Sequence, residues 1–295
     1  MVKYVIALLV SVILGSYSIG EDSHRASLSA QLVALNPDVL NEQEAATAKD
    51  ILVEYARDQQ SAADDREAQA LEAVRSLKGW EKHRDPRIEA LARSLGTPPV
   101  EPLKVTTTSR IGGVGYSIEN LVISGRPGLP ITANLYLPDP PLDNMPAILI
   151  CPSHHRPKEQ GELQDMGMTW ARSGAVVLIL DNLGHGERRQ QPFAGREDYH
   201  WRYNLGIQLH LVGQSLMGWM VADLRRCLDV MLARRDVDTG RVILIGAVAG
   251  GGDPAAVTVG LDSRVTCSIP FNFGGGSRVP GQTVSYNFVG GGSWE

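Results

Sequence analysis

Residues 241–254 read Arg-Val-Ile-Leu-Ile-Gly-Ala-Val-Ala-Gly-Gly-Gly-Asp-Pro, and this stretch decides the fold. Its first part, Val242 to Ile245, is a short apolar run typical of a buried strand. The small residues that follow predict a tight turn packed against a neighbouring strand and helix, because such a turn leaves little room for side chains. A helical pattern then begins near Asp253 and Pro254. The stretch therefore predicts a strand, a sharp turn and a helix in succession.

The flanking sequence alternates between strand and helix patterns, which predicts an α/β fold with a doubly wound sheet. The predicted strands cover Val105 to Ile111, Tyr116 to Ile123, Ile131 to Leu137, Ala147 to Cys151, Val176 to Leu180 and Val265 to Ile269. The predicted helices cover Leu163 to Arg172, Ile207 to Arg234 and Pro254 to Leu261. No internal repeat interrupts this order.

The N-terminal third differs in composition. Residues 1–20 combine Lys3 with a short apolar run and small residues near Gly20, which predicts a cleaved signal peptide and export to the periplasm or the medium rather than a stable membrane anchor. Residues 21–100 form a helical extension, in which Asn41 and Glu44 predict a capping box. Residues 101–295 then form the α/β domain.

Composition narrows the classes of partner. The 295 residues include 43% hydrophobic and 21% charged residues, as in a soluble globular protein. A formal net charge of -5 without basic runs argues against a nucleic-acid partner. The three cysteines are too few for a disulfide framework, and two of them lie in apolar runs typical of core strands, so we interpret them as small core residues. No zinc-type ligand spacing occurs. We therefore expect no metal and no organic cofactor.

Several local runs carry a resemblance to a known family. They are Arg126 to Gly128 followed by Ala133 to Pro138, then Asp181 to Glu187, and Val237-Asp238 leading into the opening stretch. Together with the order of elements, these runs resemble the α/β-hydrolase superfamily, and within it the acetyl xylan esterase-like and dienelactone-hydrolase-like esterases. The resemblance covers roughly residues 80–295. It implies a serine nucleophile held on the sharp turn between strand and helix.

The nucleophile position carries no serine in this chain. Many relatives read Ser-Gly-Gly-Gly where this chain reads Ala249-Gly-Gly-Gly, so we take Ala249 as the nucleophile position. Counting Gly-x-Ser-x-Gly from Gly246 gives Val248 instead. The resemblance also implies an oxyanion hole formed by the backbone NH groups of Gly250 and of a residue near His155, although relatives usually carry a His-Gly pair in the latter loop.

Two other polar residues invite a catalytic interpretation. His185 precedes the nucleophile in chain order, whereas the histidine of this fold follows it, so we read His185 as structural. Ser215 lies within a nearly complete nucleophile motif but in the predicted long helix, so we reject it. No histidine follows His210, and the chain ends at Glu295 before the strands that carry the acid and histidine in relatives. We therefore expect a C-terminally incomplete domain, from a partial or truncated sequence.

These observations predict an exported carboxylic-ester hydrolase of acetyl xylan esterase-like type, acting on a small-molecule or carbohydrate ester. With Ala249 and without the later acid and histidine, we expect this form to be inactive. One alternative is a non-catalytic binding protein with the same fold. A prolyl-oligopeptidase-like peptidase is a further alternative, although no propeller-like repeats are present.

Overall fold

The computed structural model of the protein describes residues 28–35, 38–96, 98, 100–153, 157–191 and 198–271. The predicted signal peptide and the last residues of the chain lie outside this part. Contacts between Cα atoms divide the chain into two units, Met1–Arg75 and Ser76–Glu295.

The first unit is helical. Helix α2 (Glu42–Glu72) follows a short helix over 28–34. The predicted capping box is confirmed: the backbone NH of Glu44 donates to Asn41 Oδ1 and the NH of Asn41 donates to Glu44 Oε2, both at 2.9 Å. Helix α2 has no buried residue, so its order comes from local hydrogen bonds and the cap rather than from packing within the described residues.

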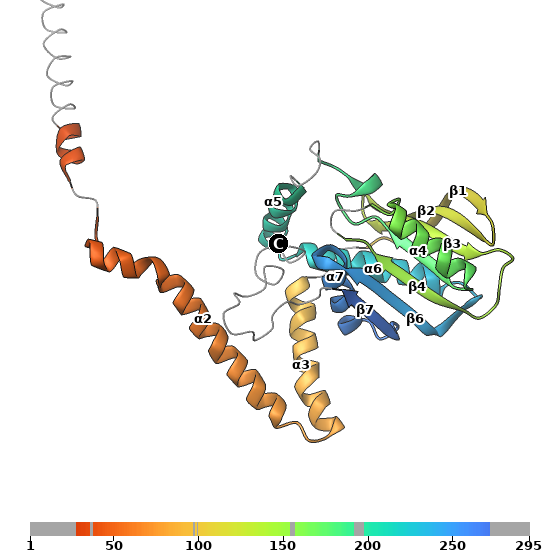
Figure 1. Ribbon diagram of the computed structural model, residues 1–295, viewed down its shortest axis with the longest axis horizontal. Coiled ribbons are helices and arrows are strands. Elements are labelled where there is room, and N and C mark those ends of the chain that lie inside the picture. Colours follow the sequence, from red (N-terminus) through yellow and green to blue (C-terminus); the bar gives the residue numbers. More distant parts are fainter. Residues whose placement is uncertain are drawn as a thin grey trace, which may run out of the picture. The chain divides into compact units, whose positions relative to one another are not determined.

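The second unit is built on a seven-stranded sheet in the order β1-β2-β3-β5-β4-β6-β7 (Figure 1). The strands are β1 (Val105–Gly113), β2 (Tyr116–Arg126), β3 (Leu129–Pro138), β4 (Met145–Cys151), β5 (Val176–Leu180), β6 (Val237–Ala247) and β7 (Cys267–Phe271). Strands β1, β2, β3 and β5 pair antiparallel, whereas β5, β4, β6 and β7 run parallel. All seven predicted strands are confirmed. The short apolar runs of β4 and β5 are buried along nearly their whole length, as expected for strands covered on both faces, whereas β1 is mostly exposed.

Helices cover both faces of the sheet. They are α3 (Leu77–Leu95), α4 (Gly161–Arg172), α5 (Asp198–Leu211), α6 (Leu216–Leu232) and α7 (Val248–Leu261), with a 3-10 turn at Gly186–Arg188. Helix α6 packs on one face through residues such as Leu224 and Leu228, and α4 packs on the other through Ala171 (Figure 1). Helix α3 packs outside α6 and α7, where Leu95 contacts the cluster that contains Met217. The predicted α/β architecture with an N-terminal helical segment is therefore confirmed.

The prediction of one helix from Ile207 to Arg234 was wrong. The chain leaves the helical conformation after Leu211, and Gly213 adopts a left-handed φ of 71°. Helix α6 then starts afresh at Ser215, whose Oγ accepts from the NH of Gly218 at 3.0 Å. The apolar stripe that suggested continuity breaks at Val212, which is 66% exposed. A glycine and a serine cap therefore separate two helices.

No helix in the described part of the chain is both long enough and apolar enough to cross a membrane.

Candidate functional site

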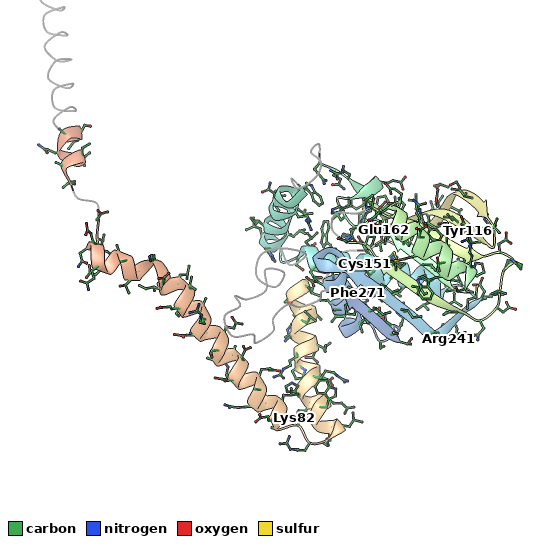
Figure 2. The ribbon with its side chains drawn as sticks, viewed as in Figure 1. Lys82, Tyr116, Cys151, Glu162, Arg241 and Phe271 are labelled. Carbon is green, nitrogen blue, oxygen red and sulfur yellow. The ribbon has the colours of Figure 1, made fainter. Side chains whose placement is uncertain are left out.

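The carboxyl ends of β4, β5, β6 and β7 meet at one edge of the sheet, because these four strands are parallel. In Figure 2 the labelled Cys151 and Phe271, at the ends of β4 and β7, lie at this edge, and Arg241 lies toward the opposite edge. Open α/β sheets bind ligands in the crevice outside the carboxyl ends of their strands. The carboxyl edge of these strands is therefore the candidate functional site.

The strand-to-helix junction lies between Ala247 and Val248. Helix α7 begins at Val248, five residues earlier than the predicted start at Asp253, so the prediction of a turn over the three glycines was wrong. A glycine inside a helix lowers the stability of that helix by about 1 kcal/mol relative to alanine. Close packing explains its presence here: a Cβ on Gly251 would collide with the carbonyl oxygen of Cys151 and lie 2.8 Å from that of Pro152. The glycines let α7 approach the end of β4.

Pro254 lies inside α7 and cannot donate a backbone hydrogen bond, so the carbonyl of Gly250, four residues earlier, lacks its helical partner. The side chain of Asn182 replaces that donor. Asn182 Nδ2 donates to Gly250 O at 2.9 Å and to Pro152 O at 2.8 Å. One buried amide on the loop after β5 therefore joins the loop after β4 to the first turn of α7.

The neighbouring Asp181 fixes the other end of the loop after β4. This carboxylate is fully buried; its Oδ1 accepts from the backbone NH of Lys158 at 2.9 Å, and its Oδ2 accepts from Lys158 Nζ at 2.6 Å. Thr132 Oγ1 on β3 donates to Oδ2 at 2.8 Å, and Lys158 Nζ also lies 2.5 Å from Glu187. Asp181 and Asn182 thus hold the residues on both sides of 154–156.

Two titratable groups at this edge have shifted pKa values. Burial disfavours the charged form of Lys158, but the hydrogen bonds to Asp181 and Glu187 and their negative charges outweigh burial and raise the pKa of this ammonium. Burial raises the pKa of the Cys151 thiol to about 12, against a smaller opposing effect of the hydrogen bond to Asn182. Lys158 therefore stays charged as part of a structural ion pair, and Cys151 stays a neutral thiol rather than a nucleophile.

A second buried ion cluster fastens the same loop to α6. Arg188 Nη1 donates to the backbone oxygen of Asp181 at 3.0 Å and to Asp223 Oδ2 at 2.7 Å. Asp223 Oδ1 in turn accepts from Arg126 Nη1 at 2.8 Å. Burial lowers the pKa of Arg126, partly offset by the charge of Asp223. The ion pair between Arg188 and Asp223 thus connects the loop that carries Asp181 and Asn182 to helix α6.

A pocket of about 360 Å³ opens at the junction of β4, β6, β7 and α4. Its size falls within the range of small-molecule sites, which is about 300–1,000 Å³. Most of its lining is apolar, with Ser153 and Gln160 as the residues with polar side chains that approach it. The lining residues are Ile150, Cys151, Pro152, Ser153, Gln160, Leu163, Met166, Ile245, Gly246, Ala247 and Phe271.

Among the residues that the structure describes, no group of three or more His, Cys, Asp or Glu side chains is placed to hold a metal ion.

No protein-family model matches the sequence, and no curated protein sequence matches it significantly. Among solved structures, a protein from Bacteroides fragilis NCTC 9343 assigned as an acetyl xylan esterase matches with a TM-score of 0.55 at 20% identity, over 65% of this chain and 53% of its own. A methylesterase matches with a TM-score of 0.55 at 21% identity, over 72% of this chain and 45% of its own. This chain has the α/β-hydrolase fold. It spans about half the length of the solved structures that it matches.

The structure describes some of the predicted site residues and not others. Ala249 and Gly250 lie in the first turn of α7, at the carboxyl edge of the sheet, and the side chain of Ala249 lies outside the described residues. His155 also lies outside them. His185 is buried, with Nδ1 3.2 Å from the carbonyl oxygen of Leu183. The sequence interpretation placed Ser215 mid-helix; it caps α6 instead, and its Oγ donates to Leu95 O at 2.9 Å.

The residues that organise this edge were missed by sequence reasoning. Asp181 and Asn182 belong to the run Asp181 to Glu187, which indicates the family resemblance but does not by itself indicate their hydrogen bonds, and Lys158 belongs to no recognisable motif. One signal was present: Pro254 inside a helical pattern requires a substitute donor for the carbonyl of Gly250. The sequence alone does not say that this donor is Asn182, 68 residues earlier.

Proposed function

We propose that this chain is an α/β-hydrolase domain of the carboxylic-ester hydrolase type, whose nucleophile serine is replaced. The observation that carries the proposal is the apolar pocket directly beside the β6–α7 junction, lined by Gly246 and Ala247. In this fold the junction is where a nucleophile is held. The structural likeness to an acetyl xylan esterase and a methylesterase supports ester chemistry as the reaction of relatives.

Two sets of glycines favour two different residues as the nucleophile position. The three glycines that follow Ala249 favour Ala249 itself. Gly246 favours Val248, because Gly-x-Ser-x-Gly requires glycine two residues before the nucleophile. A Cβ on Gly246 would collide with the carbonyl oxygen of Gly251 and lie 2.9 Å from the Cβ of Ala255. If Ala249 is the nucleophile position, the residue two positions earlier is Ala247, which is not a glycine. We keep both positions and test them separately.

In a relative with an intact site, serine at this junction would attack the ester carbonyl while a histidine takes its proton and a carboxylate orients the histidine. The backbone NH of the residue after the nucleophile and an NH from the loop after β4, near His155, would stabilise the oxyanion. Removing one such donor costs about 2.7–4 kcal/mol of transition-state stabilisation in a well-studied hydrolase. Among the described residues, Asn182 binds the carbonyl oxygens of Pro152 and Gly250, and Asp181 accepts from the backbone NH of Lys158.

The test restores the nucleophile. We would prepare the full chain as the single variants Val248→Ser and Ala249→Ser, and incubate each with a 4-nitrophenyl ester in the presence of imidazole, which substitutes for a general base. Acylation is measured by intact mass and by peptide mapping, beside nitrophenolate release. We expect one acyl group on the new serine of one variant and none on the parent chain. Acylation of neither serine would refute the esterase proposal.

A second candidate function is non-catalytic binding of a ligand in the same pocket. It is favoured by Val248 and Ala249, since neither side chain can act as a nucleophile. Calorimetry would then show that the parent chain binds an ester, and no product would be released, whereas turnover by the parent chain would exclude this function.

The leader-like pattern over residues 1–20 supports export of either form, which signal-peptide processing in a bacterial host would test.

A further inference from the structure

We propose that the pocket beside the β6–α7 junction accepts an apolar acyl group larger than acetyl. The inference rests on the proposed function, because it identifies the pocket as the acyl side of an ester site. It concerns the described pocket wall formed by β4, β6 and α4, and it does not depend on whether the chain turns over its ligand.

The size of the pocket is the first argument. An engineered cavity of about 150 Å³ lined by Leu, Ile and Phe is large enough to bind benzene. The pocket here is about 360 Å³. An acetyl group would leave most of it unfilled, and unfilled space next to apolar walls forfeits the dispersion contacts that a longer chain would make. A branched, medium-length or aromatic acyl group fits this space better.

The chemistry of the wall is the second argument. Ile150 and Ile245 come from the sheet, and Leu163 and Met166 come from α4; all four belong to the apolar layer between α4 and the sheet. A sugar placed here would bury hydroxyl groups with few hydrogen-bond partners, which is unfavourable because each group loses its hydrogen bonds to water. An acyl chain carries no such groups. The apolar part of the ligand therefore occupies the pocket, and the polar alcohol lies outside it.

The position of the pocket is the third argument. Gly246 and Ala247 line it immediately before the first residue of α7, and Cys151 and Pro152 line it at the start of the loop after β4. These are the two segments from which the oxyanion donors would come. An ester carbonyl held between them has its acyl carbon chain directed along the wall formed by α4. Met166 on that helix is then positioned to set the length of chain that fits.

The test uses the parent chain and a series of stable ligands, N-acetyl-, N-butanoyl- and N-hexanoylglucosamine, with binding measured by calorimetry. We expect affinity to rise with each added methylene by up to about fourfold, the factor that burying one methylene supplies. Hexyl glucoside, which carries the same chain on the alcohol side, should bind more weakly than N-hexanoylglucosamine. Equal binding by the three acyl ligands, or tighter binding of hexyl glucoside, would overturn the inference.

Variants of the wall give a second measurement. Met166→Trp should fill the pocket and remove the gain from chain lengthening, while Thr169→Trp, at an exposed position of α4, should leave it unchanged. Leu163→Ala should instead shift the preference to longer chains, which keeps the inference testable where the tryptophan variant does not fold. A chain-length preference that is the same in all three variants would refute the role of this wall. Acylation of a restored serine tests the esterase proposal independently.

Discussion

The hydrogen bonds of Asn182 predict that this amide is a main source of order at the carboxyl edge. Its Nδ2 donates to Pro152 O at 2.8 Å and to Gly250 O at 2.9 Å, and its side chain is buried. Asn182→Ala removes both donors and leaves two carbonyl groups in a buried setting. Each buried acceptor without a partner costs about 1–3 kcal/mol. Gly250 O keeps a weak contact with the thiol of Cys151 at 3.6 Å, so we expect a loss of about 2–4 kcal/mol in total.

Urea unfolding followed by tryptophan fluorescence measures this loss. The signal reports on the second structural unit, Ser76–Glu295, because all five tryptophans follow residue 75. The matched control is Asn204→Ala, at an exposed position in α5, which should change the free energy of unfolding by less than about 0.5 kcal/mol. A loss for Asn182→Ala as small as that of the control would refute the role assigned to the amide. It would mean that the two carbonyls find other partners.

Asn182→Asp adds a pH dependence with a defined sign. The carboxyl keeps the shape of the amide but, when ionised, it faces two carbonyl oxygens, so its folded-state pKa lies above the unfolded value of about 3.9. A raised folded-state pKa means that stability is retained below the unfolded pKa, where the protonated carboxyl can donate one hydrogen bond, and is lost as the pH rises through the folded pKa. The deficit of Asn182→Asp should therefore grow from pH 5 to pH 7, whereas that of Asn182→Ala should stay nearly constant.

Two further predictions concern packing and thiol chemistry. Gly251→Ala should destabilise the sheet unit by about 1–3 kcal/mol in the same urea assay, since its Cβ would collide with backbone oxygens, while Gly112→Ala, with no atom within 4 Å of the new Cβ, should be nearly neutral. In the native protein a thiol-specific disulfide reagent should modify only the exposed Cys267 rapidly; Cys151, buried and with a pKa of about 12, should react only after unfolding. Rapid modification of two or more thiols per native chain would contradict the second prediction.

The strands were predictable because their signal is local. Val176 to Leu180 is a continuous apolar run, and every residue in it is buried between α4 and α6. The capping box at Asn41 was likewise predictable, since both of its hydrogen bonds span three residues. The break before α6 was missed because Leu209 and Leu216 keep a helical apolar spacing across it. Gly213 and the Ser215 cap were the local signals that outweigh that spacing.

The candidate site was only partly predictable, since its organising contacts join distant parts of the chain. The amide of Asn182 replaces a hydrogen bond that Pro254 removes, and Asp181 binds both the backbone and the side chain of Lys158. Propensity alone favours a turn at three successive glycines. Tertiary packing overrides that propensity, because only glycine at 251 allows α7 to approach the end of β4.

This packing also changes how the glycine run bears on function. From the sequence, glycines kept beside a missing serine weigh against a protein that only binds its ligand. In the structure, Gly246 and Gly251 each lie against backbone atoms that a Cβ would meet, so packing of α7 on the sheet requires them with or without catalysis. The glycines are therefore expected in an esterase and in a binding protein alike, and they do not distinguish the two functions. The difference between the two rests on the side chain at the first turn of α7, which is why acylation of Val248→Ser or Ala249→Ser is the deciding measurement.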